Sequence, residues 1–174
     1  MKKSLIAAAL LAGSAFATMA HAADGTINFT GNITDATCTV TPSTANQTVR
    51  LGDVASSGLT AVGATSAPSR FNIVLTACPA TATSATIKFD GPSDAANSSL
   101  LALTAGAGVA TGVGVGLYEQ DAVTQIPVGG TSASRTLSTT VDTTFNFIAK
   151  YVATNATVVA GSANATSAFT VSYN

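Results

Sequence analysis

The side chains best suited to chemistry in this 174-residue chain are two cysteines, Cys38 and Cys78. Two cysteines can form a disulfide, contribute to a metal site or act as reactive thiols. The only histidine, His21, lies in a segment that we expect to be removed. A Ser–His–Asp triad, a Cys–His pair and a zinc-bound water then lack the base that they need. Because export leads to an oxidising compartment, we predict a Cys38–Cys78 disulfide, which would stabilise the fold by about 4 kcal/mol.

Paired carboxylates are the remaining candidates for acid–base chemistry. Asp90 and Asp94 lie close in sequence, as do Glu119 and Asp121, but both pairs are next to predicted turns. We interpret them as solvated loop charges rather than as a glycosidase pair. The glycines within 106–116 resemble a phosphate-binding loop only in their spacing, because such a loop opens a helix in a βαβ unit. The sequence therefore predicts no enzyme activity, no metal and no cofactor.

The first 22 residues are typical of an export signal. Lys2 and Lys3 give it a positive start, residues 5–17 are small or apolar, and Ala20-His21-Ala22 fits the cleavage pattern. Its removal leaves five basic and eight acidic residues in a chain of about 152 residues, which is enough for one domain with one core. The resulting charge of about −3 gives no electrostatic footprint for nucleic acid.

The elements that must position these residues are predicted to be strands. Thr, Ala, Ser, Gly and Val are abundant whereas Glu and Lys are scarce, which favours strands joined by small-residue turns over long helices. Turn signals such as Asp90-Gly91-Pro92 and Gly129-Gly130 separate the β-like segments, and this spacing predicts an all-β sandwich or barrel. The expected strands are residues 26–34, 48–54, 70–77, 85–89, 100–103, 113–119, 145–152 and 168–173.

Both ends of the mature chain alternate apolar and polar residues with the period of a strand. At the N-terminal end, one face would carry Gly25, Ile27, Phe29, Gly31 and Ile33. At the C-terminal end, the alternating apolar positions are Phe169, Val171 and Tyr173. An amphipathic edge strand without charge or proline is a liability for a monomer, because it can pair with the edge of another sheet.

Four features together resemble the pilins of chaperone–usher fimbriae, in particular type 1-like fimbrial major subunits. Residues 25–33 lead into Cys38, and Arg70-Phe71-Asn72-Ile73-Val74-Leu75 leads into Cys78. The chain ends in Phe169-Thr170-Val171-Ser172-Tyr173-Asn174, and Gly161 is the fourteenth residue from the C-terminus. This ending is similar to the motif by which fimbrial chaperones recognise their subunits. The resemblance extends over essentially the whole mature chain.

The resemblance implies a pilin fold, an incomplete immunoglobulin-like β-sandwich that lacks its final strand and is completed by donor-strand exchange. Residues 1–22 would be the signal peptide, residues 23–34 the N-terminal donor-strand extension and residues 35–174 the pilin domain. The donor face would be the five N-terminal positions named above, with Gly31 opposite a restricted pocket. The acceptor groove and chaperone-recognition site would include Gly161, Phe169, Val171 and Tyr173.

The implied partners are other copies of the subunit or related pilins, a periplasmic fimbrial chaperone and an outer-membrane usher, but no nucleic acid. The chain would pass through the periplasm to a surface fimbria that supports cell adhesion. About fifteen residues precede Cys38 in the mature chain, which leaves both a shaft subunit and an adaptor open. Gly31 could instead mark a bulge in an ordinary first strand. The alternative function is a monomeric secreted β-sandwich that acts as an adhesin or carbohydrate-binding module, although tryptophan is absent and an aromatic platform is hard to build.

Overall fold

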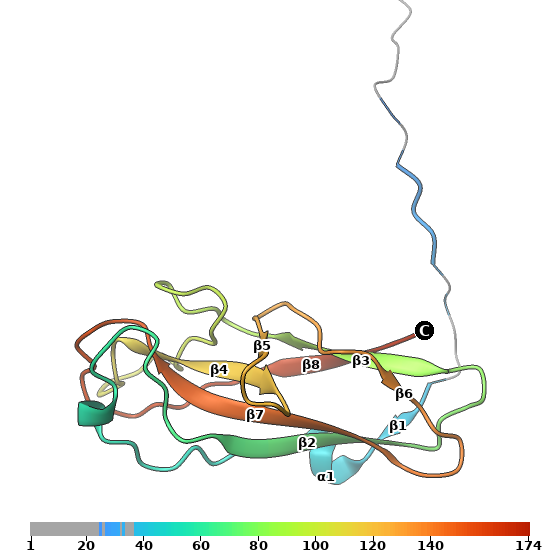
Figure 1. Ribbon diagram of the computed structural model, residues 1–174, viewed down its shortest axis with the longest axis horizontal. Coiled ribbons are helices and arrows are strands. Elements are labelled where there is room, and N and C mark those ends of the chain that lie inside the picture. The colour runs from blue at the N-terminus through green and yellow to red at the C-terminus, as the bar shows by residue number, and fades with distance from the viewer. Residues whose placement is uncertain (1–24, 26, 32, 34–36) are drawn as a thin grey trace, which may run out of the picture. The chain divides into compact units, whose positions relative to one another are not determined.

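The computed structural model describes residues 25, 27–31, 33 and 37–174 (Figure 1). The chain divides into two units, Met1–Ile33 and Thr34–Asn174. The described residues of the first unit form neither a helix nor a strand. The predicted strand over 26–34 is therefore wrong at those positions in the single chain, and Thr26, Asn32 and Thr34 lie outside the described residues. A strand requires a neighbouring strand for its backbone hydrogen bonds, which the alternating pattern cannot supply by itself.

The second unit consists of two antiparallel sheets (Figure 1). Every strand pair within them is antiparallel. The five-stranded sheet has the order β1 (Thr39–Val40), β2 (Ser69–Thr76), β7 (Thr143–Ala153), β4 (Val113–Glu119) and β5 (Gln125–Ile126). The three-stranded sheet has the order β6 (Arg135–Thr136), β3 (Ser84–Asp90) and β8 (Ala168–Tyr173).

The core lies between the inward faces of the two sheets. β-Branched and aromatic residues favour these strands, and their alternation sends every second side chain inward. Ile73 and Phe147 from the five-stranded sheet meet Ile87 and Phe89 from the three-stranded sheet, and all four are buried. The Phe89 and Phe147 rings pack edge to face with their centroids 5.0 Å apart. The predicted all-β sandwich is confirmed.

Helix is confined to two short pieces, α1 (Pro42–Ala45) and the 3₁₀ turn η1 (Ser56–Gly58). Proline is tolerated at the start of α1 because its missing N–H would have no partner there. None of the helices in the described residues is long and apolar enough to cross a membrane.

The strand predictions are confirmed wherever the apolar pattern is long. The segments predicted at 113–119 and 168–173 match β4 and β8, and those at 70–77, 85–89 and 145–152 match β2, β3 and β7 within a few residues. The predictions over 48–54 and 100–103 are wrong. Residues 48–54 are assigned no strand, and of 100–103 only Leu101 forms isolated bridges, to Ser93 and to Val115.

The predicted disulfide is confirmed, since Cys38 is bonded to Cys78 across a sequence separation of 40 residues. Cys38 precedes β1 and Cys78 follows β2, and these strands pair with Thr39 opposite Thr76. The bridge therefore fastens the first strand of the domain to its neighbour at one edge of the sheet. Both sulfur-bearing residues are buried in the main core.

Candidate functional site

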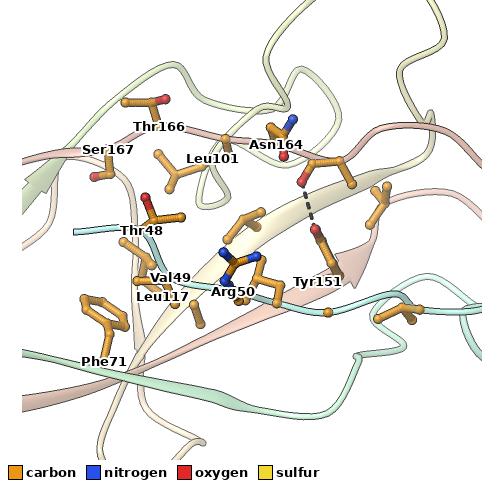
Figure 2. A pocket seen from close by; sticks show the side chains of 18 of the residues that line it. Thr48, Val49, Arg50, Phe71, Leu101, Leu117, Tyr151, Asn164, Thr166 and Ser167 are labelled. Carbon is orange, nitrogen blue, oxygen red and sulfur yellow. Dashed lines mark hydrogen bonds between the residues drawn. The ribbon is translucent and has the colours of Figure 1, made fainter.

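A groove of about 1120 Å³ opens beside β8 (Figure 2). One wall is the segment 44–54, and the other consists of residues 158–169. Side chains of both sheets line it between these walls, including Phe71, Leu117 and Tyr151. The groove therefore opens onto the core itself.

The inward side chains of β8 are incompletely covered. Phe169, Val171 and Tyr173 are half-buried, whereas the outward residues between them are exposed. They pack against the main core, so they belong to it, but one side remains open. Phe169 lines the groove directly.

The backbone of β8 is also unpaired along the same edge. Ser84 and Asn174 exchange two backbone hydrogen bonds, of 3.2 and 2.9 Å, so every second residue of β8 from Ser172 back to Ala168 bonds to β3. The N–H and C=O groups of Phe169, Val171 and Tyr173 consequently point away from β3. In the part of the chain that the structure describes, no strand pairs with that edge. The half-buried residues of β8 are thus also the ones whose backbone groups are unpaired, and the first of them, Phe169, lines the groove.

The opposite wall is extended but makes few backbone hydrogen bonds. Among the described residues, positions 46–54 make no backbone–backbone hydrogen bond. Side chains secure this segment instead: Gln47 Nε2 donates to Asn72 O at 2.8 Å, and Ser69 Oγ donates to Arg50 O at 3.0 Å. The wrong strand prediction over 48–54 has this physical reason, since β2 contacts the segment through side chains and no strand of the described residues pairs with its backbone.

Two tyrosine hydroxyl groups tie the β8 side of the groove to the rest of the sandwich. Tyr151, on β7, donates to Ala163 O at 2.8 Å (Figure 2). Tyr173, on β8, donates to Cys38 O at 3.4 Å, which is a long contact. Burial raises the pKa of both tyrosines, and the Asp53 carboxylate raises that of Tyr151 further.

Gly161 lies where two backbone segments approach closely. A Cβ atom there would be 2.5 Å from both Ala110 N and Gly108 O, which no side chain allows. Ala110 N donates to Ser162 O at 2.9 Å, and Ser162 N donates to Gly108 O at 2.8 Å. The absence of a side chain thus lets the wall that leads into β8 lie flat on the 108–110 segment.

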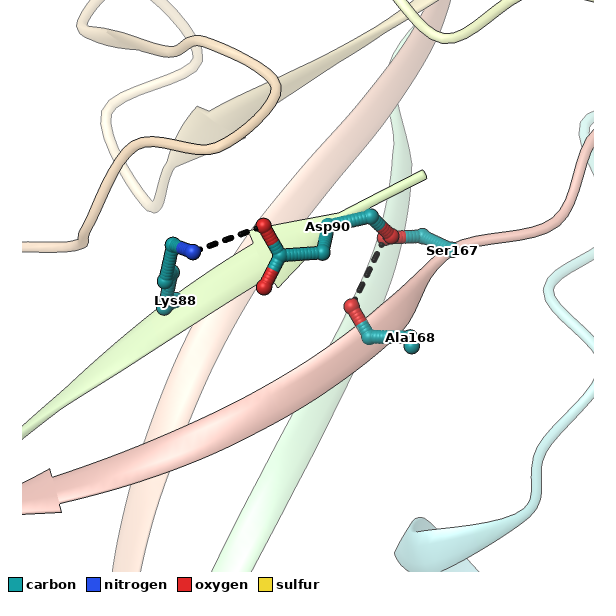
Figure 3. Close-up of polar contacts among 4 residues, drawn as sticks. All are labelled: Lys88, Asp90, Ser167 and Ala168. Carbon is teal, nitrogen blue, oxygen red and sulfur yellow. Dashed lines mark hydrogen bonds and ion pairs between the residues drawn. The ribbon is translucent and has the colours of Figure 1, made fainter. Parts of the chain in front are cut away.

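The start of β8 is fastened to the end of β3 (Figure 3). Ser167 Oγ lies 3.0 Å from Asp90 O and 3.1 Å from Ala168 O. Lys88 Nζ lies 2.8 Å from Asp90 Oδ1 on the exposed face. Of these contacts, the one between Ser167 Oγ and Asp90 O joins the two elements, at the position where the wall becomes β8, whereas the Lys88–Asp90 pair lies within β3.

The N-terminal positions predicted for the donor face lie in the first unit. Ile27, Phe29 and Ile33 are exposed, and no atom comes within 4 Å of a Cβ built on Gly25 or Gly31. Three apolar side chains therefore lie in water in the single chain. The exposure of three apolar side chains to water within so short a segment is unfavourable in free energy.

The groove is poor in groups that could perform a reaction. Its titratable lining residues are Arg50, Asp53 and Tyr151. Within the described residues, no cluster of three His, Cys, Asp or Glu side chains could hold a metal ion. The geometry fits an uncharged, extended peptide that presents apolar side chains on one face.

A family model described as "Fimbrial protein" matches residues 27–174, the stretch that contains the groove and both of its walls. The chain belongs to the fimbrial protein family. It is 41% identical over 177 residues to the "Probable major fimbrial subunit LpfA" of Escherichia coli O157:H7, covering 99% of this chain and 97% of the relative. It is 39% identical to the "Type-1 fimbrial protein subunit" of Serratia marcescens, covering 99% of each.

Solved structures of fimbrial proteins share this fold. The Burkholderia pseudomallei antigen and type I fimbria protein is 42% identical, with a TM-score of 0.61 over 86% of this chain and 97% of that one. The P pilus rod subunit PapA is 22% identical, with a TM-score of 0.67 over 80% of this chain and all of that one, and this likeness concerns the fold alone. The chain is accordingly a structural subunit of a surface fimbria, associates with other pilins, and is not an enzyme.

Sequence reasoning found one wall of the groove and missed the other. The structure places Gly161 and Phe169 in the lining, while Val171 and Tyr173 lie further along β8 against the core. The missed residues include Val49 and Leu51 on the opposite wall, both packed on the main core. Their alternation with polar neighbours was the available signal, but it was interpreted as an ordinary strand.

Proposed function

We propose that the groove receives the N-terminal extension of a second copy, residues 23–34, and that the fimbria grows by this donor-strand exchange. Residues 35–174 would then act as the pilin domain and residues 1–22 as a signal peptide. Before assembly, a periplasmic chaperone would fill the groove, and an outer-membrane usher would direct the exchange. The completed fibre would support adhesion of the cell.

The coincidence along β8 carries the proposal. Phe169, Val171 and Tyr173 all have half-buried side chains and backbone groups that are unpaired along the open edge of β8, and Phe169 lines the groove itself. A single added strand would satisfy both needs at once, through backbone hydrogen bonds and through alternate side chains that enter the groove. A small-molecule ligand would satisfy only the second.

The N-terminal extension has the properties that this groove requires. Ile27, Phe29 and Ile33 are exposed in the single chain, and burial of each would contribute about 1.5–3 kcal/mol before the cost of ordering the strand. Between Gly25 and Ile33 the sequence has no charge and no proline. The groove lining is likewise nearly uncharged, so neither surface would need to desolvate an unpaired charge.

Gly31 would occupy the narrowest part of the groove. Because it has no side chain, a donor strand could approach the groove floor closely at that position. Gly31→Trp should therefore block insertion. It should leave the acceptor groove of the same chain intact, since residue 31 belongs to a different unit.

The test compares thermal unfolding of residues 35–174 alone with the same segment carrying residues 23–34 fused after Asn174 through a flexible linker. We expect a large rise in Tm and a monomeric product. The matched control is the same fusion with Gly31→Trp, which should lose most of the rise. An unfused segment that is already stable, with no rise on fusion, would contradict the proposal and favour a complete, monomeric binding module.

A further inference from the structure

We propose that consecutive copies also touch end to end, outside the groove: the rim formed by Val62 and Val159 on one copy packs against Val141 of the copy that donates its strand. This contact rests on the proposed donor-strand exchange, which brings the two ends together. The partner in this contact is a second copy of this chain. The contact would set how stiffly each joint of the fibre is held.

Exposed valines gather around one end of the groove. Val159 lies on the β8 side, Val54 on the opposite wall, and both line the groove, with 55% and 38% of their surfaces exposed. Val62 does not line the groove, and it is 69% exposed in the turn before Gly63, whose N–H donates to Ala153 O. Val62 and Val159, the rim valines, lie near the end at which β7 finishes, since Gly63 N donates to Ala153 O and Val159 pairs with Thr111, two residues before Val113, which lies opposite Ala153.

Val141 is 68% exposed at the other end of the sandwich. It lies two residues before the start of β7, in a turn held by a hydrogen bond from Ser138 N to Thr143 Oγ1. Thr143 shares a rung of the sheet with Leu75, and Leu75 pairs with Val40, two residues after Cys38. Val141 and the start of the domain therefore lie at one end, and the rim valines lie at the opposite end of the 11-residue β7 (Figure 1).

The direction in which the donor strand lies beside β8 determines which end of the donating copy contacts which end of the accepting copy. A donor that extends the three-stranded sheet antiparallel to β8, as every other pair here is arranged, would begin beside Tyr173 and end toward the rim. Ile33 is followed by only four residues before Cys38, a connection that spans at most about 14–18 Å with its bonds to both neighbours. The Cys38 end of the donating copy must therefore lie close to the rim valines of the accepting copy.

The two ends are complementary in character. The rim valines of one copy would face Val141 of the other copy across the joint, and neighbouring exposed apolar side chains such as the rim valines commonly mark a contact surface. A contact between different ends of identical copies is heterologous, so it can repeat without closing and gives an open fibre. The contact would then act together with the donor strand at every joint.

The experiment uses the full-length chain assembled into surface fibres by its own chaperone and usher. Val62→Asp is the informative variant, because Val62 lies outside the groove lining and cannot obstruct the donor. We expect the persistence length of the fibres in electron micrographs to fall about twofold or more, because a joint held by a short flexible connection bends freely. Val141→Asp should have the same effect.

Val123→Asp is the matched control. Val123 is 79% exposed, at the turn between β4 and β5, which follows Glu119, the residue opposite Phe147 in the middle of β7. It should leave the persistence length unchanged. The double variant Val62→Asp with Val141→Lys places one opposite-charge pair at each joint and should recover most of the stiffness.

Donor-strand exchange is read separately on the same fibres, from the ladder of polymers in unheated denaturing electrophoresis. A ladder with unchanged stiffness in Val62→Asp would overturn the end-to-end contact alone, as would an equal loss in Val123→Asp or no recovery in the double variant. Parent fibres without a ladder would contradict the donor-strand proposal instead. The Tm of each variant monomer with a bound peptide of residues 23–34 would show that the fold is intact.

Discussion

β3 and β8 are neighbours in one sheet and face the same core, yet they are covered to different degrees. Their residues lie directly opposite each other, with Ile87 beside Val171 and Phe89 beside Phe169. The inward residues of β3 are buried, whereas those of β8 are half-buried. The two strands have the same alternation, so the sequence pattern does not cause the difference.

The difference in burial between β3 and β8 arises from the neighbours along the two edges of each strand. β3 has β8 along one edge and accepts hydrogen bonds from Ser132 and Gly129 along the other, while β8 has only β3 among the described residues. A strand in the middle of a sheet has both its backbone and its side chains covered by neighbours. β8 thus has the composition of a central strand and the position of an edge strand, which is the arrangement expected of a strand that awaits a partner.

The largest expected effect comes from truncating the paired phenylalanines. Phe89→Ala should lower the free energy of unfolding by about 3–5 kcal/mol, the usual cost for a buried phenylalanine. Phe169→Ala should cost clearly less in the single chain, because its ring is only half-buried. Urea unfolding of the two variants measures this directly.

A donor peptide sharpens the same comparison. With a peptide of residues 23–34 bound, the cost of Phe169→Ala should rise toward that of Phe89→Ala, since the peptide would cover the ring. Equal costs in the absence of the peptide would mean that β8 is already covered, and the comparison would fail.

A smaller effect is expected from the tyrosine that ties the β8 wall to β7. Tyr151→Phe removes the hydrogen bond to Ala163 O and should lower the free energy of unfolding by about 0.5–1.5 kcal/mol, while retaining the ring. Tyr118→Phe is the matched control, because the structure records no hydrogen bond from that hydroxyl to the described residues. Binding of the donor peptide should weaken in Tyr151→Phe only, if the wall it secures shapes the groove.

The smallest effect concerns alkaline pH. Burial raises the pKa of Tyr118, Tyr151 and Tyr173 above the ordinary value of about 10. The unfolded chain then loses these protons first, so stability is constant below about pH 10 and falls as the pH rises through the folded pKa values. Urea unfolding between about pH 9 and pH 11 should show a shallower decline in Tyr151→Phe than in the parent.

The donor peptide distinguishes the contribution of Tyr151 to the dependence of stability on pH from that of Tyr118. Tyr151 lines the groove, whereas Tyr118 does not. A bound peptide should steepen the dependence on pH through Tyr151, because additional burial raises its pKa further. A peptide effect that persists in Tyr151→Phe but disappears in Tyr118→Phe would contradict this assignment.

The sequence was most informative where alternation runs for six or more residues. The bounds of β4 and β8 were predicted correctly, β8 because it alternates throughout and β4 because it is a mostly apolar segment that is buried on both faces. β1, β5 and β6 each have two residues, too few to carry a period, and they are specified by pairing with distant strands. The order of strands in the sheets likewise depends on long-range contacts that no local pattern encodes.

The groove illustrates the same limit. Its β8 wall was predicted through a family resemblance at the C-terminus. Residues 48–54, within the opposite wall, are predicted to form an ordinary strand because their alternation is genuine, and the missing neighbour is a property of the assembled sheet. The alternation of apolar and polar residues predicts which side chains face inward, but it does not predict whether a neighbouring strand will pair with the segment that carries them.

Thr170 and Ser172, on the outward face of β8, bond to β3 through their backbones alone and point away from the groove. Their side chains are therefore free of the demands that fix the residues between them. Substitutions at Thr170 and Ser172 should therefore leave the inward surface of β8 unaltered. One strand thus combines an inner surface constrained by packing with an outer surface whose side chains the fold leaves open to replacement.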